Sequence, residues 1–138
     1  MSDTPAPSTP PAVSADEDNT IAIISYLFGI GFVIAAVMFS SKKTPLSAFH
    51  LRQSLGLIIV GIAGWFVFIA LGIMAAVLAG IPVVGFVLIK SISLLNMAYG
   101  LGMLVLWIMG ILGAANREQK PLPVLGALFQ QKLATLFT

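Results

Sequence analysis

The sequence contains no cysteine and a single histidine, His50. The chain therefore forms no disulfide bond and offers no thiolate to a metal ion. Four of its five carboxylates lie within residues 1–19, far along the chain from His50. One imidazole without nearby carboxylates is a poor ligand set for zinc or iron, so we expect no metal and no cofactor.

Charged residues are also scarce, at 9% of 138 residues, whereas 59% are hydrophobic and the mean hydropathy is +1.05. Soluble domains carry about 25% charged residues, so this composition excludes a soluble enzyme. The net charge of +2 combines −4 within residues 1–19 with +6 in the rest of the chain. An acidic tail joined to a basic-flanked apolar body gives no reason to expect nucleic-acid binding.

Residues 1–19 contain four prolines among acidic, Ser, Thr and Ala residues. Such a segment buries too little apolar surface to offset its chain entropy, so we expect it to be disordered. It also lacks the basic start of a secretory signal. Residues 20–138 are expected to form one transmembrane helical domain.

Three apolar segments are each long enough to cross a bilayer as a helix. They cover residues 21–39, 55–79 and 91–113, and the shortest spans about 28 Å at about 1.5 Å per residue. A last amphipathic stretch, residues 124–137, is too short and too polar to span, so we expect it to lie among lipid headgroups. The predicted fold class is an all-α integral membrane protein with three transmembrane helices and an interfacial helix.

The positions of Lys and Arg favour three crossings. The alternative, four crossings, divides residues 51–89 near residues 69–71, where no polar residue marks a turn. Basic loops remain in the cytoplasm, and residues 40–54 and the C-terminal tail are both basic. We therefore expect a multi-pass inner (plasma) membrane protein with its N-terminus outside, its C-terminus cytoplasmic, and Lys90 outside. Its partners are then the lipid bilayer and, through the basic loop, anionic lipid headgroups.

Small residues at helical spacing predict where helices pack, because association in lipid depends on close backbone approach. Gly72, Ala76 and Gly80 share one face of the second predicted span, and Gly102 and Gly110 lie on the third. These strips predict either an internal hairpin of the two spans or a homo-oligomer or other membrane-protein complex.

Polar residues inside or beside the spans are the candidate functional residues. His50 and Ser54 are four positions apart and are expected to share a helical face, while Arg52 and Gln53 point elsewhere. The cluster is interpreted as an interfacial anchor, or as a contact for a partner or translocating substrate. Asn96 is interpreted as an interhelical hydrogen-bonding residue, or as part of a transport path.

Two segments together resemble a small, uncharacterised bacterial membrane-protein family. Residues 47–56 (SAFHLRQSLG) resemble its FHxRQ segment, and residues 114–126 (AANREQKPLPVLG) resemble its closing A-N-x-G-x-x-x-P-x-x-G stretch, with Glu118 where glycine is common. The family is similar in outline to the chloroplast inner-envelope import component of the Tic translocon. The positions that match its motifs are His50, Arg52, Gln53, Asn116, Pro123 and Gly126.

The resemblance implies a structural or accessory subunit in protein translocation or membrane-protein assembly. The alternative is an oligomeric channel or transporter for small solutes, since three spans with one Asn do not enclose a polar path. A membrane enzyme would need a nucleophile or carboxylate near the polar residues of the predicted cytoplasmic side. Those residues are His50, Arg52, Asn116 and Arg117. We therefore expect no catalytic activity.

Overall fold

The computed structural model describes residues 14–138, and within this range the chain is all-α. Its five helices are α1 (Ala15–Ile24), α2 (Phe28–Ser41), α3 (Pro45–Leu78), α4 (Pro82–Ala115) and α5 (Gly126–Lys132). Most of the segment predicted to be disordered lies outside the described residues, but its last part is the start of α1. The Ser14 hydroxyl caps this helix by accepting a hydrogen bond from the Glu17 backbone N–H. Acidic residues in the first turn also favour a helix N-terminus.

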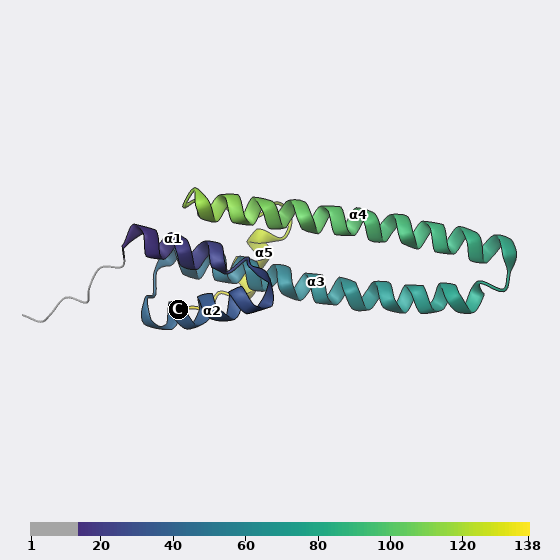
Figure 1. Cartoon of the computed structure of the whole chain (residues 1–138), viewed down its shortest axis with the longest axis horizontal. Helices are drawn as coiled ribbons and strands as arrows, with labels where there is room; N and C mark the ends of the chain where they lie inside the picture. Colours follow the sequence, from purple (N-terminus) through teal and green to yellow (C-terminus); the bar gives the residue numbers. More distant parts are fainter. Residues whose placement is uncertain (1–13) are drawn as a thin grey trace, which may run out of the picture.

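Helices α3 and α4 form a long antiparallel hairpin (Figure 1). Each has 34 residues, about 51 Å of helix, which exceeds the ~30 Å hydrocarbon core of a bilayer. Thr44 caps α3, and Pro45 and Pro82 occupy the first turns of the two helices, where a missing N–H is tolerated. The predicted end of the second span at residue 79 agrees with the end of α3 at Leu78. The third span was predicted to begin at residue 91, but α4 already begins at Pro82, where the proline starts the helix.

Helix α3 is continuous through residues 69–71, so the structure does not show the break that the four-crossing alternative requires. An apolar run without a polar side chain offers the backbone no alternative hydrogen-bond partner to the helix. Its internal hydrogen bonds therefore continue.

The first predicted span, residues 21–39, is not one helix, and this prediction is wrong. The chain turns at Ser25–Leu27, and α2 runs back beside α1 (Figure 1). A Cβ placed on Gly31 would lie 2.5 Å from the Ile24 backbone oxygen, so glycine is needed for this tight return. The turn also lets the Tyr26 side chain enter the protein, where it is buried.

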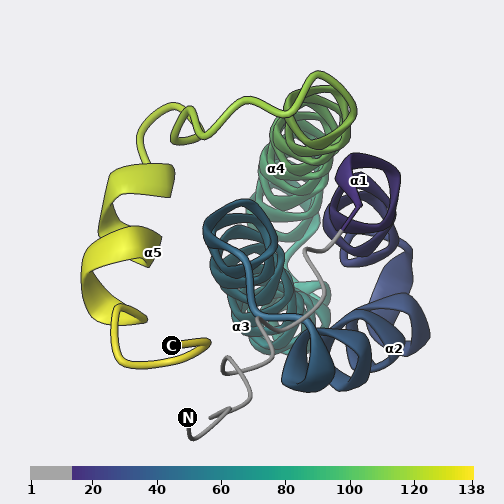
Figure 2. The same cartoon turned by 90° about the vertical axis from the view of Figure 1, so that its left-hand side faces the viewer.

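Helices α1, α2 and α5 gather around one end of the hairpin, with α3 in the middle (Figure 2). We call this part the wide end. It comprises residues 14–57, which include α1, α2 and the start of α3, and residues 104–138, which include the end of α4 and α5. The remaining residues, 58–103, form the bare hairpin. The start of α1 and the C-terminus both lie at the wide end, whereas the three-crossing interpretation places them on opposite sides of the membrane (Figure 1).

Two apolar clusters hold the wide end together. The first joins α1, α3, α4 and α5 and contains Ala22, Tyr26, Leu57, Ala114, Leu122 and Phe129. The second joins α1, α2 and α3 and contains Ile21, Ala35, Phe39, Ala48 and Leu51.

The bare hairpin buries little of its apolar surface within the chain. In an apolar 18-residue stretch of α3 only 6% is buried, and in α4 only 11%. The core helix of a soluble protein would be mostly buried, whereas these helices expose large apolar side chains such as Trp65, Ile73 and Phe86. Both helices are long and apolar enough to cross a membrane, and they indicate membrane association.

The last helix is shorter than predicted. Residues 124–137 were expected to be one amphipathic helix, but α5 covers Gly126–Lys132. Phe129 inserts against α3 at Gly56, and the chain then bends so that the Phe137 ring packs against Phe32 and Phe39. Phe32 and Phe39 both belong to α2, and these ring contacts favour the bend over a longer α5.

Candidate functional site

A buried hydrogen-bond network connects three parts of the wide end. The Tyr26 hydroxyl lies 3.1 Å from Nδ1 of His50 and 3.4 Å from Oε1 of Gln53. All three side chains are buried, and His50 is 1% exposed. Burial raises the pKa of Tyr26, so the phenol remains a neutral hydrogen-bond donor. We call Tyr26, His50 and Gln53 the polar node.

The polar node also binds the chain that leaves α4. Nε2 of His50 lies 3.0 Å from the Glu118 backbone oxygen, and Nε2 of Gln53 donates to the Lys120 backbone oxygen at 3.2 Å. A carbonyl oxygen accepts only, so Nε2 of His50 carries a proton and donates. In the neutral ring Nδ1 then accepts from Tyr26, and every ring nitrogen has a partner.

The polar node therefore connects the two segments that carry the family resemblance. His50 and Gln53 belong to residues 47–56, and the carbonyl groups they bind belong to residues 114–126. A third contact lies just beyond the second segment, where the Phe129 ring packs against Gly56. The ring leaves no room for a side chain at position 56. The pairing of the two motifs in one sequence has a physical reason, because each completes the other's hydrogen bonds.

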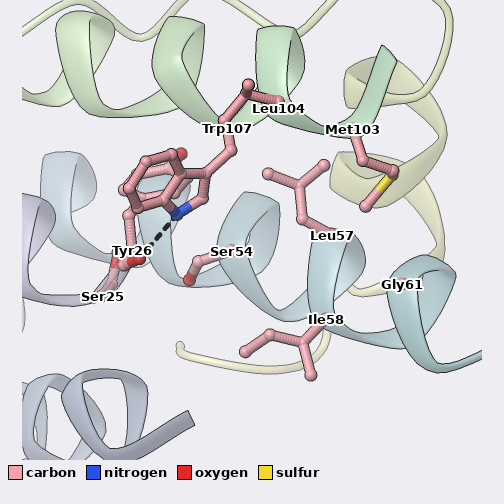
Figure 3. Close-up of a pocket in the computed structure, with 9 residues that line it drawn as sticks. All are labelled: Ser25, Tyr26, Ser54, Leu57, Ile58, Gly61, Met103, Leu104 and Trp107. Carbon is pink, nitrogen blue, oxygen red and sulfur yellow. Dashed lines mark hydrogen bonds between the residues drawn. The ribbon is translucent and has the colours of Figure 1, made fainter. Parts of the chain in front are cut away.

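Trp107 and Gly110 of α4 fix the Tyr26 end of the polar node. The indole Nε1 of Trp107 donates to the Tyr26 backbone oxygen at 2.7 Å (Figure 3). A Cβ on Gly110 would overlap the Tyr26 ring, so the missing side chain makes space for the phenol. Gly110 was predicted as a helix-packing residue, and it does provide a close contact, although with the α1–α2 turn.

The end of α4 presents the Glu118 carbonyl to His50. Asn116 is the C-cap, and Arg117 has a positive φ of 60°. The Arg117 N–H binds the Ala114 oxygen, and the Glu118 N–H binds the Gly113 oxygen at 2.8 Å. This is the Schellman pattern, in which glycine is the usual residue at the left-handed position. The Arg117 guanidinium compensates by donating to the Ala15 backbone oxygen of α1.

The remaining residues of the closing motif shape the turn into α5. A Cβ on Gly126 would lie 2.7 Å from the carbonyl carbon of Pro121, so glycine is needed for this close approach. The Pro123 backbone oxygen accepts from Leu125, while the Pro123 side chain is exposed. Asn116 is exposed and contributes its cap geometry.

Arg52 holds the end of the chain instead of extending freely to lipid phosphates. Its Nε donates to the Leu136 oxygen at 2.9 Å and its Nη2 to the Phe137 oxygen at 3.2 Å. Lys43 donates to the Thr138 oxygen at 2.8 Å. The expected anchor is therefore also a clamp on the residues that follow α5.

The mouth of the α1–α2 hairpin is charged. The Lys42 Nζ lies 2.5 Å from Oε1 of Glu17, and the Thr44 hydroxyl donates to the Asp18 carboxylate. The hydrogen bond from Lys42 and its positive charge hold the pKa of the Glu17 carboxyl below its ordinary value of 4.5. These contacts tie the first turn of α1 to the connection between α2 and α3.

An apolar cavity of about 330 Å³ adjoins the polar node (Figure 3). Its walls come from α3, α4 and the α1–α2 turn. The residues that line it are Ser25, Tyr26, Ser54, Leu57, Ile58, Gly61, Met103, Leu104 and Trp107. The Ser25 and Ser54 hydroxyls donate to the Ala22 and Leu51 oxygens of their own helices. The cavity thus suits an apolar occupant, because its serine donors are already paired.

The predicted strip of small residues does not form the α3–α4 contact. A Cβ on Gly72, Gly80 or Gly102 would meet no atom within 4 Å, and Ala76 is exposed. The helices approach at Gly64 instead, where the Tyr99 ring covers the glycine and its hydroxyl donates to the Val60 oxygen at 2.6 Å. A large side chain that needs a backbone partner determines this contact, rather than the spacing of small residues.

The structure alters the predicted arrangement of the polar cluster. His50 and Gln53, three positions apart, point into the same network, although Gln53 was expected to point away from His50. Both are buried, so they are not an exposed anchor. Tyr26 and Trp107 were not predicted as site residues. The signal for Tyr26 was its place beside Ser25, in the one polar interruption of an apolar run.

No protein-family model, curated protein or solved structure matches this chain.

Proposed function

We propose that the protein is a two-crossing inner-membrane protein and an accessory subunit in protein translocation or membrane-protein assembly. In this proposal α3 and α4 cross the bilayer and the wide end lies at the cytoplasmic surface. The α1–α2 hairpin enters the near leaflet and returns, and α5 lies at the interface. The apolar cavity beside the polar node receives an apolar segment of a client protein, and this cavity is the observation that carries the proposal.

The positions of the charges support this orientation. Six of the seven Lys and Arg residues are in the wide end, and Lys90 alone is in the bare hairpin. Basic residues beside a span favour the cytoplasm, whereas Asp and Glu have little influence. The Lys90 ammonium lies 5.8 Å from the centre of the Phe86 ring, one turn closer to the tip. Its side chain thus extends toward the far interface, as a snorkelling lysine does.

The outer face of α2 supports entry of the α1–α2 hairpin into the near leaflet. Ile30, Val33, Ile34 and Val37 are all exposed large apolar residues. The mouth of the hairpin carries the Glu17–Lys42 ion pair, which belongs in water. A hairpin with an apolar outer face and a charged mouth matches the boundary between headgroups and hydrocarbon.

The cavity lies where a client segment would leave water. Leu57 and Met103, on either side of the border between the wide end and the bare hairpin, both line it. A soluble ligand would need polar groups to orient it, whereas this lining offers mostly apolar surface. Burial in this cavity would stabilise an apolar side of a helix or an acyl chain. The resemblance to a family related to an import component makes a polypeptide the favoured occupant.

Site-specific photocrosslinking in native membranes tests the proposal. Photoreactive residues at Leu57 and Met103 report on the cavity, and one at Ile73, exposed on the bare hairpin, is the matched control. Photoreactive residues at Arg52, Asn96 and Arg117 report which molecules lie beside other parts of the protein. Many unrelated nascent chains captured at Leu57 and Met103, but not at Ile73, would support a client site. Equal capture at all positions, or lipid adducts alone, would contradict it.

An oligomeric channel or transporter for small solutes is the second candidate, and Asn96 is the observation that favours it. Within residues 14–138 this exposed amide makes no hydrogen bond, so it is free to line a shared path. Solute flux into proteoliposomes that is lost in Asn96→Leu would support a channel. The polar node does not supply such a path in one copy, because its side chains bond one another and backbone oxygens.

A further inference from the structure

Asn96 is a polar side chain in an apolar setting. It lies on α4 in the bare hairpin, exposed, and without a hydrogen-bond partner among residues 14–138. It borders a groove of about 440 Å³ between α3 and α4. The other residues that line this groove are Gly61, Trp65, Phe68, Ile69, Tyr99 and Gly100.

The position of Asn96 along α4 places it inside the bilayer. It lies about 21 Å from Pro82 at one end of the helix and about 30 Å from Asn116 at the other, at about 1.5 Å per residue. If α4 crosses the membrane, Asn96 is therefore within the hydrocarbon layer. An amide there loses its water partners, so a protein partner stabilises it strongly relative to lipid.

The neighbouring polar groups of the groove do not provide that partner. The Tyr99 hydroxyl already donates to the Val60 backbone oxygen. The Trp65 ring, 60% exposed, packs against Phe66 and forms an apolar wall. The partner of Asn96 must therefore come from outside this copy.

We propose that this groove is a homodimer interface, in which the Asn96 amides of two copies bond each other across a two-fold axis. An amide has both a donor and an acceptor, so it is complementary to its own copy in a symmetric pair. Gly100 is one turn away and has open space above it, so a second α4 can approach closely. A second copy is thus the occupant that satisfies both features.

Charge does not oppose this pairing. Lys90 is the only charged residue of α4. At about 100° per residue it lies about 120° around the helix from Asn96, so two copies that meet at Asn96 keep their lysines apart. The proposal depends on α4 crossing the bilayer, but not on the client site.

The test uses the full chain in phosphatidylethanolamine–phosphatidylglycerol vesicles, and it benefits from the absence of cysteine. Gly100→Cys reports on the proposed interface, and Gly72→Cys, equally open on α3, is the matched control. On oxidation we expect a disulfide-linked dimer from Gly100→Cys and little from Gly72→Cys. Preferential linkage of Gly72→Cys would overturn the proposal, because the dimer would then use another face.

A second measurement places its reporter outside the proposed interface. A dye on Gln131→Cys, exposed on α5, reports association by energy transfer as the protein is diluted in lipid. Asn96→Leu should weaken the dimer about three- to thirtyfold, and Asn96→Gln should retain most of the association. Energy transfer absent at every protein density, or unchanged in Asn96→Leu, would overturn the proposal. Flotation of each variant with the vesicles shows separately whether membrane insertion has failed.

Discussion

The Nε2 atom of His50 lies 3.0 Å from the backbone oxygen of Glu118, which is 68 residues later in the chain. This contact joins the first third of α3 to the chain that leaves α4. Together with the Tyr26 contact on the other ring nitrogen, it closes the wide end around a buried polar node. Both ring nitrogens of His50 have a partner, and a buried polar network of this kind specifies one arrangement of the segments it joins.

Replacing His50 with Ala should destabilise the wide end. The substitution removes hydrogen bonds at both ring nitrogens and leaves a void, so we expect a loss of about 2–4 kcal/mol in the free energy of unfolding. Denaturant titration in detergent micelles measures it. Gln131→Ala, at an exposed site, is the control and should change stability by less than about 0.5 kcal/mol. An equally small effect for His50→Ala would show that the network does not stabilise the fold.

Two glycines of α4 should respond in opposite ways to a methyl group. Gly110→Ala overlaps the buried Tyr26 ring and should cost about 1–3 kcal/mol. Gly102→Ala meets open space, and the higher helix propensity of Ala should leave stability unchanged or raise it by up to about 1 kcal/mol. The same titration compares them. Equal responses would mean that Tyr26 does not occupy the space above Gly110.

The Arg117→Gly variant should be more stable than the Arg117→Ala variant. Both substitutions remove the guanidinium contact with Ala15, but Ala keeps the strain of a φ of 60° and Gly relieves it. We expect the free energy of unfolding of Arg117→Gly to exceed that of Arg117→Ala by about 1 kcal/mol. Thermal unfolding of the two variants checks the difference, and equal stability would contradict the left-handed cap.

The Glu17–Lys42 ion pair should make the mouth of the hairpin sensitive to acid. The pKa of Glu17 is lowered in the folded chain, so its contribution is present above the ordinary value of 4.5 and is lost as pH falls through the folded value. Wild type should unfold at a higher temperature than Glu17→Gln at pH 7, and the difference should disappear at low pH. Both residues are partly exposed, so high salt should also reduce it. A difference that persists in acid would exclude the ion pair as its cause.

Hydropathy predicted the central parts of the two long helices, because residues 55–79 and most of residues 91–113 are apolar. The turn at Gly80 and the continuous helices around it follow from Pro82 and from the lack of alternative backbone partners. The first apolar run also has few polar residues, but it folds back at Tyr26, whose hydroxyl needs a polar partner. That partner, His50, is 24 residues away, and a local window of sequence does not contain it.

Two residues of the polar node, His50 and Gln53, were predicted as site residues, but Tyr26 and the geometry of the node were not. His50 and Gln53 stood out as polar residues beside an apolar helix, and the two matching segments were recognised as a pair. Their contacts with the carbonyls of Glu118 and Lys120 were not predicted, because every residue has a backbone oxygen and the sequence does not show which of them accepts a hydrogen bond. The spacing of small residues also predicted the wrong contact between α3 and α4, since Tyr99 fixes that contact at Gly64.

The central claim is that the α1–α2 hairpin returns to the side from which it enters, so that the chain crosses the membrane twice. Single cysteines at Ala15, Gln131 and Gly80, in this cysteine-free chain, can be labelled in sealed membranes with an impermeant thiol reagent. The account predicts that Ala15→Cys and Gln131→Cys are labelled from the same, cytoplasmic side and Gly80→Cys from the other. Labelling of Ala15→Cys and Gln131→Cys from opposite sides would contradict it and would support three crossings.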